Sequence, residues 1–383
     1  MSVYDLKAVN TVIIILKKLS GKTNKKERDE NKVKFVRIKK PLKVNELTKL
    51  LSKANNSYED DKFRFVFVAQ RDLYKDYKWS KYLRAHEIYY KLIKNSKMTE
   101  LKNLADVSVG VVTLANDFFI LSKEQANKLG IEKRFLKPVI TTPSKINSLM
   151  IKKEDTNQYI FIANESKTQL SNTNALKYIT YGEEKNVTIT KGHEKGKIVR
   201  GYPKLPALST KKVWYSLGNR ESYDVLVPIH IWNRWYAIWN KDKVYCTDNF
   251  YWIKPNKKEN LLSLLGLLNS TVTEFFVELI GKTVYGEGVI ELRKHIFDEI
   301  PILNLEKLSK NEKQLIGNLF LKLCETREKD DQKDELKIRQ ELDVTIFDIL
   351  EIKDAKEQVY EELENLRATR KSKKKTEVMI KSD

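Results

Sequence analysis

Residue types that commonly do chemistry occur in this 383-residue chain, but none stands at catalytic or metal-ligand spacing. The one Gly-x-Gly, at Gly286 and Gly288, follows an apolar helical stretch and a turn, whereas a phosphate-cradling loop needs a strand before it and a helix after it. There is no Walker sequence, and no Cys, Asp or Glu stands at ligand spacing from the four histidines, which are His86, His193, His230 and His295. We therefore expect no catalytic residue, metal or cofactor in this chain.

One segment has the chemistry of phosphate binding. Between residues 185 and 212 there is a single acid, Glu194, against eight basic residues: Lys185, Lys191, Lys195, Lys197, Arg200, Lys204, Lys211 and Lys212. Such a run can follow a nucleic-acid backbone and release the counterions around it.

Aromatic residues are concentrated immediately after this basic segment. Five of the six tryptophans lie there, interleaved with cations: Trp214, Trp232, Trp235, Trp239 and Trp252, with Arg220, Arg234, Lys241 and Lys243. Rings beside cations suit contact with sugars, base edges and phosphates, and Arg and Asn can read bases bidentately. The alternative is that most of these rings form the core of a β-rich domain.

The overall charge agrees with a polyanionic partner. The chain has 72 Lys and Arg against 52 Asp and Glu, a formal net charge of +20, which favours nucleic acid before other partners. A generally lysine-rich proteome would give the same excess without such a partner, and that alternative stays open.

The composition is typical of a soluble protein in a reducing compartment, and we expect a cytoplasmic protein with no membrane association. Cys246 and Cys324 are far apart and predict neither a disulfide nor a zinc site. The apolar run at 12–16 is too short for a signal peptide. The stretch 260–280 has membrane length, but Glu274 and Glu278 within it favour a long buried helix, closed by Gly281.

The chain divides into three predicted parts, of α+β class. Residues 1–100 contain an apolar strand at 12–16 suited to cover on both faces, a lysine-rich loop at 21–31, strands at 33–38 and 63–67, and a helix at 44–53. They resemble the end of a sheet whose earlier strands lie elsewhere.

Residues 101–303 are predicted to be mixed and rich in strands. Alternation covers 107–121, a short helix ends at Gly130, and further strands are expected at 159–163, 187–190, 223–227, 235–239 and 243–246. Residues 304–383 are predicted to be helical. Apolar stripes at 315–323 and 342–350 suit docking onto the body of the protein, Asp354 and Glu357 suit a capping box for a third helix, and 367–375 is expected to be a solvated basic tail.

The order of these segments resembles the carboxyl half of an adenine-specific DNA methyltransferase of a restriction–modification system. The resemblance covers nearly the whole chain, although each motif alone is loose. Leu114 stands where the pattern has a glycine. The motifs that carry the resemblance are residues 10–13, 70–83, 109–119, 135–140, 212–217, 225–228, 247–251, 264–270, 285–288, 300–302, 341–350 and Arg370.

The resemblance implies a target-recognition domain preceded by the end of a catalytic α/β sheet and followed by terminal helices. The family's cofactor loop and its Pro-Pro catalytic loop would precede Met1, and no two prolines are adjacent in this sequence. S-adenosylmethionine is therefore implied for the complete enzyme but not for this chain, which we expect to be inactive alone, to bind duplex DNA and to pair with a catalytic half.

By chemistry and location, the residues expected to contact DNA are Lys137, Lys211, Lys212, Tyr215, Asn219, Arg220, Arg234, Lys282 and Arg293. Two other functions stay open. The chain could be a structural or interaction subunit without sequence-specific recognition, or it could belong to a nuclease. No acid-x-lysine pair in a strand context supports the nuclease.

Overall fold

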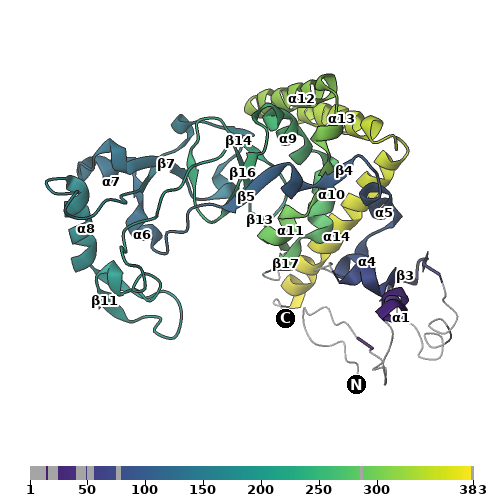
Figure 1. The fold of residues 1–383 in the computed structure, drawn as a ribbon, viewed down its shortest axis with the longest axis horizontal. Coiled ribbons are helices and arrows are strands. Elements are labelled where there is room, and N and C mark those ends of the chain that lie inside the picture. The colour runs from purple at the N-terminus through teal and green to yellow at the C-terminus, as the bar shows by residue number, and fades with distance from the viewer. Residues whose placement is uncertain are drawn as a thin grey trace.

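The computed structural model describes residues 14–15, 25–39, 49, 56–74, 79–284 and 288–380, with no account of the side chains of Ser80 and of 372–380. Within these ranges the chain is a mixed α+β protein, and the predicted fold class is confirmed (Figure 1). Helices α9 to α14 gather at one end, a lobe with α6, α7 and α8 lies at the other, and strands β5, β14 and β16 lie between them.

The first part contains a three-stranded antiparallel sheet in the order β1 (Lys32–Ile38), β3 (Phe63–Ala69), β2 (Tyr58–Glu59). Its two long strands were predicted, and this prediction is confirmed. The predicted loop at 21–31 is wrong for Lys25–Glu30, which form the helix α1, and its first four residues lie outside the described ranges. Asn31 bonds Gln70 at the start of α3 (Gln70–Leu73). Such long-range contacts are not visible in local composition.

Two predictions for this part fall largely outside the described residues. They are the strand at 12–16 and the helix at 44–53, of which only Lys49 is described. In the first of them only Ile14 and Ile15 are described; they belong to no element and are 67% and 88% exposed in this chain, so the predicted strand is not tested. No other described segment of this chain packs over them.

The central sheet separates two hydrophobic cores. Its order is β5 (Ala105–Val109), β16 (Phe250–Pro255), β12 (Val225–Pro228), β14 (Ile238–Asn240), β8 (Met150–Ile151). Successive side chains of a strand point to opposite faces. Val225 and Val227 therefore face a core shared with the helices, whereas Leu226 faces a core shared with the lobe.

The lobe is built on a second sheet, in the order β15 (Tyr245–Cys246), β7 (Leu136–Ile140), β9 (Gln158–Phe161), β6 (Ile120–Ser122). Helices α6 (Asn116–Phe119), α7 (Lys123–Lys128) and α8 (Asn174–Glu184) pack around it. The predicted short helix ending at Gly130 is confirmed, with φ of 62° at that glycine. A hairpin of β10 (Asn186–Thr188) and β11 (Ile198–Arg200) extends from the lobe.

The predicted continuous alternation at 107–121 is wrong, because β5 ends at Val109 and α6 precedes β6. A Cβ on Gly110 would lie 2.2 Å from the carbonyl oxygen of Thr247, so the backbone approaches closely at the end of β5. Leu114 then has φ of 62° before α6 begins. That conformation favours glycine, the residue that the resemblance led us to expect at this position.

The single helix predicted at 260–280 is also wrong. It consists of α9 (Leu261–Leu268) and α10 (Thr271–Ile280), bent by 68°. The Asn269 side chain causes the break, since it accepts from the backbone N–H of Ala237 and donates to the carbonyls of Ala237 and Leu265. Ser270 then caps α10. Among the described residues no single helix could cross a membrane, and this bent pair has the length and composition to do so but is buried in the protein.

Three helices close the chain: α12 (Lys310–Glu328), α13 (Gln332–Ile349) and α14 (Ala355–Ile380). Their apolar stripes pack into the helical core, as predicted. The shorter elements of this half are α4 (Ser80–Arg84), α5 (Glu87–Ile93), β4 (Met98–Glu100), β13 (His230–Ile231), β17 (Lys282–Val284), β18 (Val289–Glu291), α11 (Lys294–Asp298) and β19 (Pro301–Leu303).

The prediction of a solvated basic tail at 367–375 is wrong for its first half. Arg370 is 6% exposed and pairs with Glu278, and Arg367 pairs with Glu274 at 2.5 Å. Both glutamates lie on α10 and are buried. A buried carboxylate needs a cationic partner, and α14 supplies one to each of them.

Candidate nucleic-acid interface

A groove of about 1250 Å³ lies among five segments that are distant in sequence. They are the loop that follows β7, the stretch from the end of β12 through β13 to the turn before β14, Asn249 before β16, Val289 in β18, and the end of α12. Its lining is mostly polar and aromatic: Thr142, Pro143, Ser144, Ile146, Asn147, Pro228, His230, Ile231, Trp232, Asn233, Arg234, Tyr236, Asn249, Val289, Arg327, Glu328 and Asp330.

The turn between β13 and β14 presents Trp232 and Asn233 outward. The residues on either side of them are anchored, because Ile231 is 2% exposed and Trp235 is 1% exposed. The Trp235 indole N–H donates to the carbonyl of Leu268 at 2.5 Å. Trp232, between these anchors, is 52% exposed.

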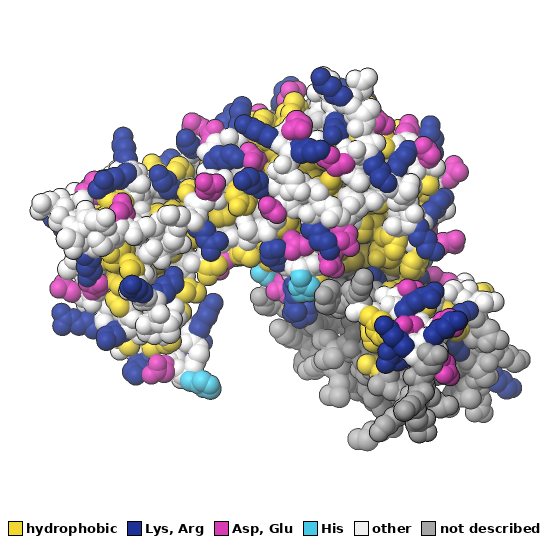
Figure 2. Space-filling model, viewed as in Figure 1, with side chains coloured by type: hydrophobic (Ala, Val, Ile, Leu, Met, Phe, Trp, Pro, Cys, Tyr) yellow, Lys and Arg dark blue, Asp and Glu magenta, His cyan; other side chains and the backbone are white. Residues whose placement is uncertain are grey.

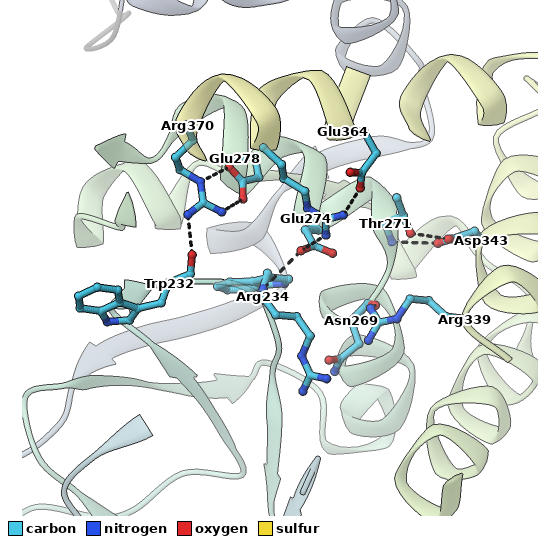
Figure 3. A network of polar contacts seen from close by, with 12 residues as sticks. Trp232, Arg234, Asn269, Thr271, Glu274, Glu278, Arg339, Asp343, Glu364 and Arg370 are labelled. Atoms are coloured by element: carbon cyan, nitrogen blue, oxygen red, sulfur yellow. Dashed lines mark hydrogen bonds and ion pairs between the residues drawn. The ribbon is translucent and has the colours of Figure 1, made fainter. Parts of the chain in front are cut away.

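Arg370 fixes the same turn from behind (Figure 3). Its Nη1 donates to the carbonyls of Trp232 and Gly288, at 2.6 Å each. Its Nε and Nη2 donate to the two carboxylate oxygens of Glu278, at 3.0 and 2.6 Å. One buried guanidinium therefore joins α14, α10 and the groove, and in Figure 3 the indole of Trp232 points away from this network.

Three arginines surround one carboxylate at the end of the groove formed by α12 and α13. Oε1 of Glu335 lies 2.8 Å from Arg327 Nη2, 3.6 Å from Arg339 Nη2 and 3.7 Å from Arg234 Nη1. A single carboxylate balances only one of these charges. Two acidic residues also line the groove, so most of the attraction for a polyanion must come from cations outside it.

Tyr236 connects the turn to the opposite side of the groove. Its hydroxyl donates to the carbonyl of Pro143 at 3.1 Å, and the guanidinium of Arg234 lies 5.2 Å from its ring. Burial raises the pKa of Tyr236 to about 12, so the phenol stays protonated and keeps donating at neutral pH. Arg234 is therefore held both by an aromatic ring and by Glu335.

The basic segment predicted from sequence forms an exposed arm. The hairpin of β10 and β11 and the loop after it carry its cations, and Tyr202 holds their base through a hydroxyl bond to Asp117 at 2.6 Å. In Figure 2, Lys and Arg side chains gather on the lower end of the lobe, where Figure 1 places β11. The described surface is indented between this arm and the rest of the molecule.

The structure disagrees with one predicted DNA contact, Tyr215. This ring is 4% exposed, its hydroxyl donates to the carbonyl of Glu165, and burial raises its pKa. Tyr215 belongs to the lobe core with its neighbour Trp214, because both consecutive rings of this turn pack inward. Three of the five clustered tryptophans are likewise buried, namely Trp214, Trp235 and Trp252.

The other predicted residues lie on three surfaces. Lys211 and Lys212 follow the basic arm, with Lys212 exposed. Asn219 and Arg220 lie in an exposed loop, where Asn219 Oδ1 accepts from Asn164 and its amide N–H₂ has no bond to any described residue. Lys137 is half-buried on β7.

The third surface is the sheet of β13, β18 and β17, which brings Lys282 and Arg293 near the groove. His230, Glu291 and Lys282 stand opposite one another in register across the three strands, and their side chains share a face. Arg293 lies 3.6 Å from the same Glu291. His230 lines the groove, and so does the predicted Arg234.

Sequence reasoning missed most of the groove. It named Trp232 only as one of several rings and did not single out Asn147, Asn233, Asn249 or Arg327. The sequence did contain one indication of the groove: Trp232 and Asn233 directly follow the end of a β-strand, where a turn exposes side chains. No local signal connects Arg327 with this turn, because the two are 95 positions apart and α12 packs on α9 rather than on β13.

Among the described residues no group of three or more His, Cys, Asp or Glu could hold a metal ion. The Gly286–Gly288 segment joins β17 to β18, which are antiparallel neighbours. A strand follows it where a dinucleotide or methyl-donor loop has a helix N-terminus, so its setting does not fit S-adenosylmethionine.

Comparison of the sequence with known protein families identifies the class of this protein. Residues 76–336 match the family described as Type II methyltransferase M.Eco57I, C-terminal domain, and the chain belongs to this family. It is a C-terminal part of a restriction–modification methyltransferase, as its resemblance indicated.

Among individual proteins, the chain is similar to Type II methyltransferase M.AccI of Acinetobacter calcoaceticus. The two are 22% identical over 302 residues, which cover 76% of this chain and 51% of that protein. The chain thus spans about half the length of this relative.

Two solved structures are also similar. The type IIG restriction endonuclease BpuSI matches 83% of this chain and 40% of its own, with a TM-score of 0.47 and 16% identity. The type IIL restriction-modification enzyme MmeI, solved in complex with DNA, matches 70% of this chain and 36% of its own, with a TM-score of 0.48 and 12% identity.

Proposed function

We propose that this chain is the DNA-binding, sequence-recognising part of an adenine-specific DNA methyltransferase of a restriction–modification system. The observation that carries the proposal is the groove, which is lined by exposed amides, an exposed indole and arginines, in a protein whose lobe also carries an exposed basic arm. These groups have the chemistry of base edges and phosphates. Membership of the methyltransferase family makes duplex DNA the polyanion for which this surface is suited.

The proposal divides the work between two kinds of side chain. Lysines and arginines of the arm, with Lys282 and Arg293, neutralise phosphates and set the register of the duplex. Groove residues with paired donors and acceptors, such as Asn147 and Asn233, read base edges. We retain residues 101–303 as the recognition domain, 1–100 as the end of the catalytic sheet and 304–383 as the supporting helices.

Methyl transfer belongs to another part of the complete enzyme in this proposal. S-adenosylmethionine would supply the methyl group there, to an adenine that has been extruded from the duplex. The sequence has no adjacent prolines and no fitting cofactor loop, which supports a separate catalytic half as the partner. The residues of this chain would hold and orient the DNA.

Charge reversal tests the proposed surface. We expect Lys211→Glu, Lys212→Glu and Arg220→Glu together to abolish most duplex binding and to flatten the dependence of log K on log salt by roughly 3, because each lost phosphate contact changes that slope by about 0.9. Fluorescence anisotropy with a labelled duplex at several salt concentrations measures both quantities.

A matched control reverses the same number of charges elsewhere. Lys91, Lys94 and Lys310 are exposed on or beside α5 and α12, outside the groove lining. Changing these three to Glu should weaken binding only slightly. Equal losses in the two triple variants would show that overall charge, rather than this surface, holds the DNA, and would favour the interaction-subunit alternative.

A further inference from the structure

Trp232 combines exposure with a fixed position. It is the most exposed of the six tryptophans, all of which are described, at 52% against 46% for Trp79 and less for the others. A single exposed ring is common on protein surfaces and is not evidence by itself. Here the ring also lines the groove beside Asn233 and Arg234.

Three anchors hold the backbone of Trp232 in place. On one side Ile231 is buried and paired with Ile290 of β18, and on the other side the indole of Trp235 is bonded to Leu268. Between them the carbonyl of Trp232 accepts from Nη1 of Arg370, which also donates to the carbonyl of Gly288, while Nε and Nη2 are bonded to Glu278. A ring on so rigid a turn loses little conformational entropy when a ligand packs on it.

The neighbouring groups indicate what could pack there. A flat apolar ring with amides and a guanidinium beside it matches a nucleobase, which has a π-face and a hydrogen-bonding edge. The centre of a protein–protein interface is depleted of charged residues, whereas four charged side chains line this groove: Arg234, Arg327, Glu328 and Asp330. The net charge of +20 also favours a polyanionic ligand.

We propose that Trp232 stacks on an unstacked nucleobase of bound DNA and that Arg370 is the positioning residue that aims it. This inference rests on the proposed function. Bases in an intact duplex have both faces covered by their neighbours, so the contact requires a base that has lost one neighbour. Stacking adds affinity without adding charge, which separates its effect from that of the lysines.

The test uses two labelled duplexes of one sequence, one fully paired and one with a single central abasic site. Trp232→Ala should weaken binding to the abasic duplex about tenfold and to the paired duplex less, with the salt slope unchanged. Trp232→Phe should recover most of the affinity, because a smaller ring still stacks. Trp79→Phe, at an exposed tryptophan outside the groove, serves as the control and should bind like the unaltered protein.

Arg370→Lys tests the positioning role. A lysine can still pair with Glu278, but it cannot bond both that carboxylate and the Trp232 carbonyl with the fixed geometry of a guanidinium. We expect a loss of abasic-duplex affinity similar to that of Trp232→Ala, and no further loss when the two changes are combined. Additive losses, measured on folded protein, would overturn the positioning role.

The remaining outcomes are distinguishable. If the unaltered protein binds both duplexes with steep salt dependence and Trp232→Ala binds equally well, the stacking inference fails and the proposed function stands. If Trp232→Ala keeps its DNA affinity but changes the oligomeric state in sedimentation, the ring is a protein contact and the inference also fails. If the unaltered protein binds neither duplex, the proposed function and the inference fail together.

Discussion

At the scale of single residues, Leu114 occupies a conformation that its side chain disfavours. Its φ of 62° lies in the left-handed region, where a non-glycine residue costs about 1–2 kcal/mol, and its side chain is 46% exposed and buries little. We expect Leu114→Gly to raise the free energy of unfolding by about 0.5–1 kcal/mol, after the larger chain entropy of glycine is subtracted. Urea unfolding followed by circular dichroism measures this change.

Leu129 is the matched control for this prediction. It is similarly exposed, at 42%, but its φ of −79° is ordinary for leucine. Leu129→Gly should lower the free energy of unfolding by about 0.5–1 kcal/mol. If both glycine variants change stability in the same direction, backbone conformation does not explain the effect at Leu114.

Single residues also show where prediction from sequence stops. The glycine expected at position 114 was a sound inference, since the backbone there has the conformation that glycine favours. Tyr215 was chosen for its chemistry, but the turn that contains it packs both Tyr215 and its neighbour Trp214 into the core. Trp232 and Tyr215 are both aromatic residues with cations nearby in the sequence. Only the three-dimensional fold determines which of the two rings faces solvent.

At the scale of elements, side-chain ion pairs join α14 to α10, in addition to apolar packing. Arg370→Ala would leave Glu278 buried without a partner, which typically costs about 3–5 kcal/mol. We expect a loss of this size in chemical unfolding, whereas Lys371→Ala, at the next and exposed position, should change stability by less than about 0.5 kcal/mol. A loss below about 1 kcal/mol for Arg370→Ala would contradict this account of the pair.

The break between α9 and α10 yields a second prediction for elements. Asn269 satisfies both backbone groups of Ala237, and Asn269→Ala leaves these buried groups unpaired. Each unpaired group costs about 1–3 kcal/mol, so we expect a loss of at least about 2 kcal/mol in urea unfolding. Ser263→Ala, which removes one buried bond to the carbonyl of Asn260, should cost less. An equal loss would contradict a special role for Asn269.

Helix existence and strand pairs could be predicted from periodicity, and the helix break could not. The run at 260–280 is apolar enough to continue as one helix. It is interrupted because Asn269 bonds the backbone of Ala237, the residue before β14 and 32 positions earlier in the sequence. The basic tail was misjudged for a similar reason. Its charge pattern indicates solvent exposure, and only the two buried glutamates of α10 show why Arg367 and Arg370 turn inward.

At the scale of the whole molecule, the first and last parts of the chain meet at His86. Its Nε2 lies 3.0 Å from Glu362 of α14 and its Nδ1 lies 3.5 Å from Glu59 of β2. Burial, assisted by the charges of Glu59 and Glu361, raises the pKa of Glu362 to about 7. Burial also lowers the pKa of His86, so burial disfavours the charged form of both partners.

These shifts predict a pH dependence with opposite signs. Because the folded pKa of Glu362 is raised from 4.5, its contribution to stability is full below about pH 4.5 and is lost as pH rises to about 7. The lowered pKa of His86 gives a contribution that is present above its unfolded value and is lost as pH falls. The stability advantage of the unaltered protein over Glu362→Gln should therefore be larger at pH 5 than at pH 8.

Urea unfolding of both proteins at the two pH values measures this difference, and contributions shared by the two proteins cancel. Glu341→Gln, at an exposed position of α13 whose charge does not act on Glu362, should show no such trend. A constant advantage, or one that grows with pH, would mean that Glu362 does not hold a proton in the folded state.

The most direct test of the central claim is the salt dependence of duplex DNA binding by the isolated protein. If the arm and groove contact about six phosphates, log K should fall with log salt at a slope of about −5, close to a thousandfold loss of affinity between 50 and 200 mM salt. The same sample should transfer no labelled methyl group from S-adenosylmethionine to DNA. Binding that is insensitive to salt, or methyl transfer by this chain alone, would contradict the account.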